Sequence, residues 1–137
     1  MGVAENQEPV RQMFEKSINA RDASAFEEYI GDTYVNHDMP AEPGPAGLKA
    51  VMGQFFAAFP DMRIVVEQSI GEGDIVATRG HFEGTHDGDF MGVPATGRKV
   101  NVQYMDMWRL QAGKAVENWV RIDTLGLMQQ LGAVPGP

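Results

Sequence analysis

An acidic residue stands between two aromatic residues on one face of a predicted strand. The strand covers residues 99–110, and because successive side chains alternate between its faces, Tyr104, Asp106 and Trp108 point the same way. If this face packs toward the core, the aromatic rings exclude water from the carboxyl group and raise its pKa. A carboxylate with a raised pKa can take up a proton near neutral pH. The opposite face carries two methionines, so alternation alone leaves both orientations of Asp106 open.

A second predicted strand, over residues 75–83, supplies cations. Arg79 and His81 share a face with two apolar residues, which predicts that both side chains point inward, toward Asp106. A buried charge needs a partner, so an Arg79–Asp106 or His81–Asp106 pair is expected. Such a pair would form a proton-transfer site with shifted pKa values. Catalysis, a polar contact to a ligand and a structural ion pair are all compatible with this pattern.

Other residues are predicted to bind the ligand. His37 and His86 lie in irregular segments, where functional residues concentrate, and could orient a substrate at the mouth of a pocket. Asp123 either contributes to the pocket or caps a C-terminal helix. The expected aromatic wall consists of Tyr34, Phe55, Tyr104, Trp108 and Trp119. The three histidines lack the spacing of a metal site, so no metal is predicted. The loop from Gly92 to Gly97 has two glycines but no helix after it, so it is not a phosphate-binding loop, and no cofactor is predicted.

The elements that must position these residues are helices first and strands afterwards. Apolar residues at helical spacing predict helices over residues 10–18, 24–30 and 48–59. Alternation and turn residues predict strands over residues 63–69, 75–83, 99–110 and 114–123, with one or two helical turns over 125–131. Residues 34–38 are predicted to be irregular. This order predicts an α+β domain with a mostly antiparallel sheet.

Composition restricts the class of protein. The 137 residues fit a single domain, 1–137, with residues 132–137 as a frayed tail. The net charge of -8 disfavours binding to nucleic acid or to an anionic membrane surface. No apolar run is long enough to span a bilayer, and the polar N-terminus does not resemble a signal peptide. Together with the absence of cysteine, these features predict a cytoplasmic protein.

Several segments resemble those of SnoaL-like polyketide cyclases. They are Tyr34-Val35-Asn36-His37, Gly44-Pro45-Ala46-Gly47-Leu48, the run from Gly84 to Arg98 (GTHDGDFMGVPATGR), Asp106-Met107-Trp108-Arg109, the run from Gly113 to Trp119 (GKAVENW) and the run from Asp123 to Gly132 (DTLGLMQQLG). The resemblance extends over about residues 10–132. It implies an NTF2-like cone, in which three helices pack into a strongly curved mixed sheet around a deep apolar pocket, often in a dimer. It also implies cofactor-free chemistry, in the family cyclases an intramolecular aldol ring closure.

The resemblance also implies site positions. A catalytic-site histidine of the family's ester cyclases falls on Asp106, and their acid–base aspartate falls on Val120. The strand Arg-x-Asp pattern of limonene epoxide hydrolase, a fold relative, becomes Arg79-Gly80-His81.

We therefore expect a cofactor-independent cyclase, lyase or isomerase that acts on a small apolar carbonyl compound. In this hypothesis Asp106 is the base, and His81 or Arg79 stabilises the enolate oxygen. A non-catalytic binding protein with the same pocket and an epoxide-hydrolase-like hydrolase are the alternatives. An outward apolar face with Met105, Met107 and Trp119 further predicts a homodimer formed through the sheet.

Overall fold

The structure is a computed structural model that describes residues 3–136, with most of its helices in the first part of the chain and four of its five strands in the later part. The helical elements are α1 (Val3–Met13), its π-helical continuation η1 (Phe14–Asn19), α2 (Ser24–Tyr29), α3 (Pro45–Ala58) and α4 (Thr124–Gln130). The strands are β1 (Ile30–Asn36), β2 (Arg63–Glu72), β3 (Ile75–Thr85), β4 (Lys99–Gln111) and β5 (Lys114–Ile122). The predicted α+β class is confirmed. Within the described residues, none of the helices is long and apolar enough to cross a membrane.

The five strands form one mixed sheet in the order β1-β5-β4-β3-β2. Strands β2 to β5 pair antiparallel in chain order, whereas β1 pairs parallel to β5 at the edge. The prediction that residues 34–38 are irregular is wrong over its first part, because β1 extends to Asn36. Its buried and exposed residues do not alternate, and its register on β5 shifts between Ile30 and Val35. Alternation could therefore not reveal this strand.

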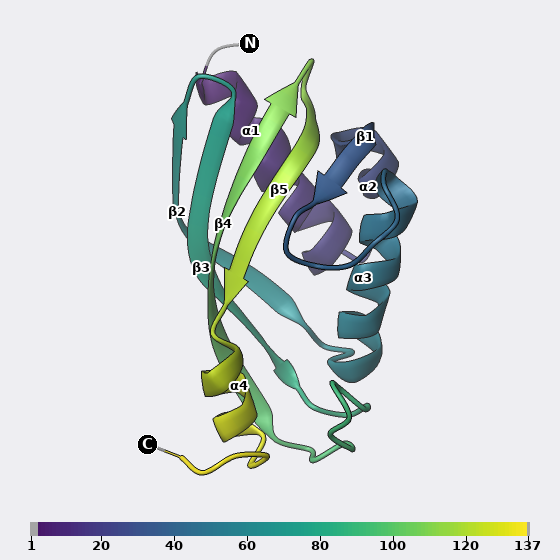
Figure 1. The fold of residues 1–137 in the computed structure, drawn as a ribbon, viewed down its shortest axis with the longest axis vertical. Helices are drawn as coiled ribbons and strands as arrows, with labels where there is room; N and C mark the ends of the chain where they lie inside the picture. Colours follow the sequence, from purple (N-terminus) through teal and green to yellow (C-terminus); the bar gives the residue numbers. More distant parts are fainter. Residues whose placement is uncertain (1–2, 137) are drawn as a thin grey trace.

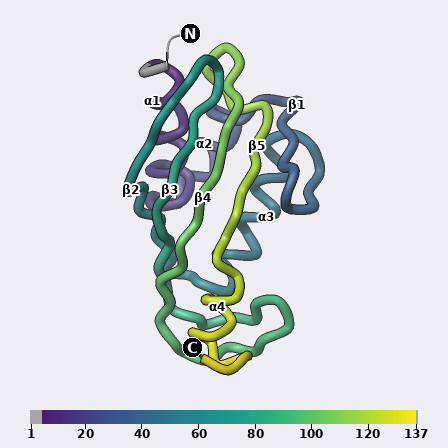
Figure 2. Tube along the Cα trace, turned by 60° about the vertical axis from the view of Figure 1, so that its left-hand side comes forward, coloured from purple at the N-terminus to yellow at the C-terminus, as the bar shows by residue number. Residues whose placement is uncertain are grey.

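The sheet curves around the helices, as Figures 1 and 2 show from two directions. Helices α1, α2 and α3 lie on one side of the strands, and α4 packs at the far end, next to β4. The tight turn between β4 and β5 has positive φ at both Ala112 and Gly113. This combination matches the turn type whose twist suits a two-residue hairpin. The hairpin brings the chain back so that β5 continues the curved wall.

The long strand β4 shows which side of the sheet is the interior. Its residues alternate between exposed and buried along almost its whole length, and the even-numbered residues are the buried ones. On β3 the even-numbered residues also face inward, because Thr78 lies opposite Asp106 and Phe82 lies opposite Val102. Cross-strand neighbours in register share a face of the sheet. The inner face therefore presents one continuous set of side chains to the helices.

Two phenylalanines at the end of α3 have different surroundings. Phe59 is completely buried, and its ring packs against Phe82, His86 and Phe90 at centroid distances of 6.2, 5.5 and 5.4 Å. Phe55 also packs against Phe82 and Phe90, but it is only partly buried. Phe59 thus anchors the helix end to both the sheet and the loop between β3 and β4.

We predict that Phe59→Ala lowers the free energy of unfolding by about 3–5 kcal/mol, the cost of deleting a fully buried ring. Phe55→Ala should cost less than half as much, because part of that ring already contacts open space. Equilibrium denaturation of the two variants beside the parent protein measures both values. Equal losses would show that the end of α3 packs differently from the structure described here.

Candidate active site

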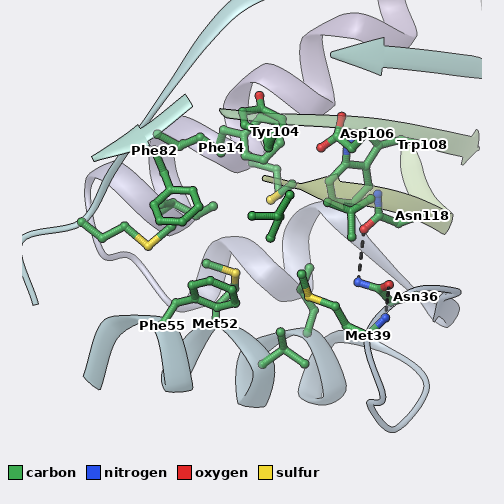
Figure 3. A pocket seen from close by; sticks show the side chains of 18 of the residues that line it. Phe14, Asn36, Met39, Met52, Phe55, Phe82, Tyr104, Asp106, Trp108 and Asn118 are labelled. Atoms are coloured by element: carbon green, nitrogen blue, oxygen red, sulfur yellow. Dashed lines mark hydrogen bonds between the residues drawn. The ribbon is translucent and has the colours of Figure 1, made fainter. Parts of the chain in front are cut away.

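A cavity of about 80 Å³ lies between the inner face of β3, β4 and β5 and the helices η1 and α3. Figure 3 shows it from close by, with Tyr104, Asp106 and Trp108 on the sheet side and Met52 and Phe55 on the helix side. Most of the lining side chains are apolar. The polar groups that reach it come from Asn36, Tyr104, Asp106, Trp108 and Asn118. The composition of this wall suits an apolar ligand with a few polar atoms.

The carboxyl group of Asp106 is the central polar feature of the cavity. Its residue is 7% exposed, and the hydroxyl of Thr78 donates a hydrogen bond of 2.5 Å to its Oδ1. Burial raises the pKa of Asp106 to about 7, against the lowering effects of the Thr78 hydroxyl and the Trp108 N–H. Desolvation wins because the neutral form loses little in an apolar cavity, whereas the carboxylate loses its hydration. Asp106 is thus poised to accept and to return a proton at neutral pH.

The hydrogen bonds around Thr78 have a defined direction. Thr78 Oγ1 lies 3.1 Å from the hydroxyl of Tyr104 as well as 2.5 Å from Asp106 Oδ1. A threonine hydroxyl carries one hydrogen, so when Thr78 donates to the carboxylate it must accept from Tyr104. Burial also raises the pKa of the Tyr104 phenol far above its usual range, which keeps that donor protonated.

The indole N–H of Trp108 is an unused donor beside Asp106. Trp108 is 3% exposed, and its Nε1 makes no hydrogen bond with any of the described residues. The N–H still favours the carboxylate form of Asp106 electrostatically, although it does not reach hydrogen-bond geometry. The ring is held between Phe14 on one side and Tyr34 on the other. A buried donor without a partner can bind an oxygen atom of a ligand.

Two asparagines form a second polar corner of the cavity. The Oδ1 of Asn118 accepts hydrogen bonds of 3.3 Å from the Tyr34 hydroxyl and from Asn36 Nδ2, the latter drawn in Figure 3. Asn36 is oriented in turn by the backbone N–H groups of Asp38 and Met39, which both donate to its Oδ1. Sequence reasoning missed both asparagines. The signal was present for Asn118, since it shares the more apolar parity of its strand with Val120 and Ile122.

The predicted inward placement of Arg79 and His81 is wrong. Both side chains lie on the outer face of the sheet, where they bind Glu67 at 2.9 and 2.7 Å. The two apolar residues that share their parity, Ile75 and Ala77, lie on that face too and are only partly buried. Neither Arg79 nor His81 contacts Asp106, so the expected ion pair with the carboxylate does not form.

His37 and Trp119 lie outside the cavity as well. Their rings stack on each other at 4.9 Å between centroids, and His37 Nε2 lies 2.9 Å from a carboxylate oxygen of Glu117. Glu117 also accepts from Arg109. The predictions that Trp119 forms part of the pocket wall and that His37 orients a substrate at its mouth do not match these positions, because β5 turns Asn118 and Val120 inward instead.

The remaining predicted residues divide between the cavity and its supports. Phe55, Tyr104 and Trp108 line the cavity, and Tyr34 supports it from behind Trp108. His86 is fully buried away from it, with Nδ1 bonded to Thr96 at 2.9 Å. Asp123 caps α4 by accepting the Gly126 N–H at 2.9 Å. Within the described part of the chain, no three His, Asp or Glu side chains gather as a metal site.

Several solved structures have the same fold as this chain. IdmH from Streptomyces antibioticus, provisionally assigned as a polyketide cyclase, is 32% identical, with a TM-score of 0.80 over 93% of this chain and 98% of its own. AclR from Streptomyces galilaeus, provisionally assigned as a hydroxylase, is 30% identical, with a TM-score of 0.87 over 99% and 86%. TsrD from Streptomyces laurentii is 25% identical, with a TM-score of 0.90 over 98% and 99%.

None of the curated proteins matches the chain at a significant level. The family described as SnoaL-like polyketide cyclase matches residues 8–131, which is nearly the whole chain. The curved sheet, the enclosing helices and the apolar cavity with its acidic residue are the features that this match spans. The chain therefore belongs to the SnoaL-like polyketide cyclase family.

Proposed function

We propose that the protein is a cofactor-independent acid–base enzyme of the polyketide cyclase type, acting on a small apolar carbonyl compound. The observation that carries this proposal is the carboxyl group of Asp106, which is buried in an apolar cavity, with its pKa raised to about 7. A structural aspartate in an ion pair would have its pKa lowered instead. In the described structure no cation lies in hydrogen-bond or ion-pair contact with this carboxylate.

The proposed reaction uses Asp106 twice. Its carboxylate removes a proton from the carbon next to a carbonyl group, and the electrons of that C–H bond form an enolate. The enolate carbon then attacks a second carbonyl of the same molecule and forms the ring C–C bond. Asp106 finally returns its proton to the new alkoxide, which leaves the enzyme unchanged.

The donor for the enolate oxygen must come from the cavity itself, because Arg79 and His81 are on the outer face. We assign this role to the N–H of Trp108, which is buried, unbonded and beside Asp106. A pre-positioned donor in a site without water stabilises developing negative charge more than the same donor in water. The amide of Asn36 is a second donor on the cavity wall.

The position of the carboxylate differs from the one that the family resemblance implies. The resemblance places a histidine at the position of Asp106 and the acid–base aspartate at that of Val120. In the sheet these two residues are direct partners, Asp106 on β4 and Val120 on β5. A carboxylate at either position would face the same cavity, which supports Asp106 as a replacement for the missing acid–base group.

The valine at position 120, where the resemblance implies an acid–base aspartate, favours a second candidate function. In this function the protein binds an apolar ligand without reacting with it. An enzyme that needs two acid–base groups would lack one here. A hydrolase with a water molecule held between Asp106 and His81 has less support, because the two side chains lie on opposite faces of the sheet.

We further propose that the chain forms a homodimer through the outer face of the sheet. Met105 and Met107 are 63% and 46% exposed on this face, next to the stacked Trp119. Light scattering should give twice the chain mass of 15.0 kDa. Met107→Glu should return the mass to that of one chain, because Met107 lies between Ala77 and Trp119 and the change places a charge in an apolar part of the interface. A single-chain mass for the parent protein at micromolar concentration would contradict the dimer.

Asp106→Asn should abolish proton abstraction. With cyclohexanone in D2O as the probe, NMR would follow the loss of the α-proton signal. We expect the parent protein to accelerate this exchange and the variant to lose about a hundredfold or more of that acceleration, the typical contribution of a general base. Asp89→Asn, an exposed aspartate in the loop between β3 and β4, is the matched control and should keep the parent rate. Exchange at the parent rate in Asp106→Asn, with cyclohexanone still bound, would instead favour the binding protein.

The raised pKa of Asp106 also predicts a pH-dependent stability. The folded state holds this proton up to about pH 7, whereas an unfolded aspartate releases it near about pH 4. Between these values the folded state binds more protons, so this residue's contribution to the free energy of unfolding falls as pH rises. Denaturation between about pH 4 and 8 should show Asp106→Asn gaining stability relative to the parent protein with rising pH. A difference that stays constant would mean that Asp106 has an ordinary pKa.

A further inference from the structure

Three polar side chains form a row across the inner face of the sheet. Ser69 on β2 lies opposite Thr78 on β3, and Thr78 lies opposite Asp106 on β4. Directly opposed residues on antiparallel strands have Cβ atoms about 4.5–5.5 Å apart on the same face. The row therefore leads from strand β2, at one edge of the sheet, to the carboxyl group in the cavity.

The middle of this row separates two hollows. One is the cavity, which Asp106 lines; the other is a groove of about 460 Å³ between α1 and β2, which Ser69 and Thr78 line. Phe14 and Ile64 line both the cavity and the groove, so their side chains lie between the two. Thr78 is thus the residue that touches the groove on one side and the carboxylate on the other.

The groove is polar enough to hold water. Charged side chains of Glu8, Arg11, Glu15, Arg63 and Glu67 surround it. At its floor, Ser69 Oγ is buried and has no hydrogen-bond partner among the described residues. A buried hydroxyl beside a polar space normally binds an ordered water molecule.

The front of the cavity offers no comparable route. Its wall is mostly apolar, and an apolar ligand in place would exclude water from it. The Tyr104 hydroxyl also contacts Thr78, but burial raises the pKa of this phenol far above its usual range, so it does not give up its own proton.

We propose that a water molecule bound by Ser69 and Thr78 connects Asp106 to the solvent in the groove between α1 and β2, so that Asp106 exchanges its proton through the back of the cavity. In the proposed cyclisation Asp106 returns its proton to the product, so the exchange with solvent restores the carboxylate form of Asp106 before turnover and does not close the catalytic cycle. That role rests on the proposed function, whereas the path itself does not. In the transfer the protonated carboxyl donates its hydrogen to Thr78 Oγ1, and the hydroxyl hydrogen of Thr78 passes to the water. The water then releases a proton into the groove. Thr78 ends with one hydrogen, and Asp106 ends as the carboxylate.

The first test separates the hydroxyl of Ser69 from its size. Ser69→Thr keeps the hydroxyl group. Ser69→Val introduces a side chain of nearly the same shape as threonine but without the hydroxyl. NMR would measure the exchange of the Thr78 hydroxyl proton with water, with no ligand present. We expect about tenfold slower exchange in Ser69→Val than in Ser69→Thr, the scale of one lost hydrogen bond. Equal exchange in the two variants would overturn the proposal.

The second test addresses Thr78 and the water directly. A high-resolution crystal structure should show an ordered water within hydrogen-bond distance of both Ser69 Oγ and Thr78 Oγ1, and its absence would overturn the proposal. Thr78→Val should raise the pKa of Asp106, measured by carbon-detected NMR, because it removes a donor to the carboxylate. Thr78→Ser should restore the pKa and the water.

These outcomes are independent of the proposed function. Loss of cyclohexanone exchange in Asp106→Asn tests whether Asp106 is a base, whereas the hydroxyl exchange tests how its proton reaches solvent. A protein that only binds a ligand could still show the water path. An enzyme could equally fail the Ser69 test, and its proton would then leave through the cavity mouth.

Discussion

The site depends on one unfavourable condition, a carboxyl group held in an apolar cavity with no cation in contact with it among residues 3–136. Such burial is tolerated when the group is hydrogen-bonded or protonated, and Asp106 has both options, through the Thr78 hydroxyl and through a pKa of about 7. The arrangement requires β3 and β4 to pair in one register, because a slip of one residue would turn Asp106 to the outer face and replace Thr78 by Arg79 or Ala77. Eleven consecutive partners between these strands, from Ile75–Arg109 to Thr85–Lys99, hold that register. The chemistry of the site is thus a consequence of sheet pairing.

The same pairing explains why the β4 residues of the site could be predicted from the sequence better than the β3 residues. On β4, aromatic and aliphatic residues of one parity favoured the inner face that the structure shows, although Met105 and Met107 on the other parity left both orientations of Asp106 open. On β3 both parities carry apolar residues, and the inward set includes Thr78 and Gly80, which look unremarkable in sequence. The wrong choice of parity directed Arg79 and His81 inward, although Glu67 on β2 offered them partners outside. A rule that weighs partners for charged residues on the neighbouring strand would have favoured the correct face.

The residues that sequence reasoning missed depend on contacts between distant segments. Asn36 lies on β1, the strand without alternation, and its role becomes visible only through the parallel pairing that places it beside Asn118. Thr78 becomes important only through its neighbours on β2 and β4. Hydroxyl and amide groups have no periodic signature of their own, since their function is set by which carboxyl, carbonyl or hydroxyl they meet. The second and third helices, by contrast, lie close to their predicted ranges because local apolar spacing determines them, whereas the first begins at Val3, seven residues before the predicted start, and continues as the π-helical η1.

The pairing of Asp106 with Val120 also accounts for why one carboxylate and one valine occupy this part of the cavity. Two carboxyl groups at directly opposed positions would repel each other when ionised, and the pKa of one of them would rise further. Burial, partly offset by hydrogen bonds, already brings the pKa of Asp106 to about 7, so in a pair of carboxyl groups one member would hold a proton at neutral pH. Valine at position 120 keeps the cavity apolar without adding charge. A histidine at position 106 would carry no negative charge and would leave an aspartate at position 120 free to ionise. Because Asp106 and position 120 are direct partners in the sheet, one carboxylate can serve the same part of the cavity from either strand.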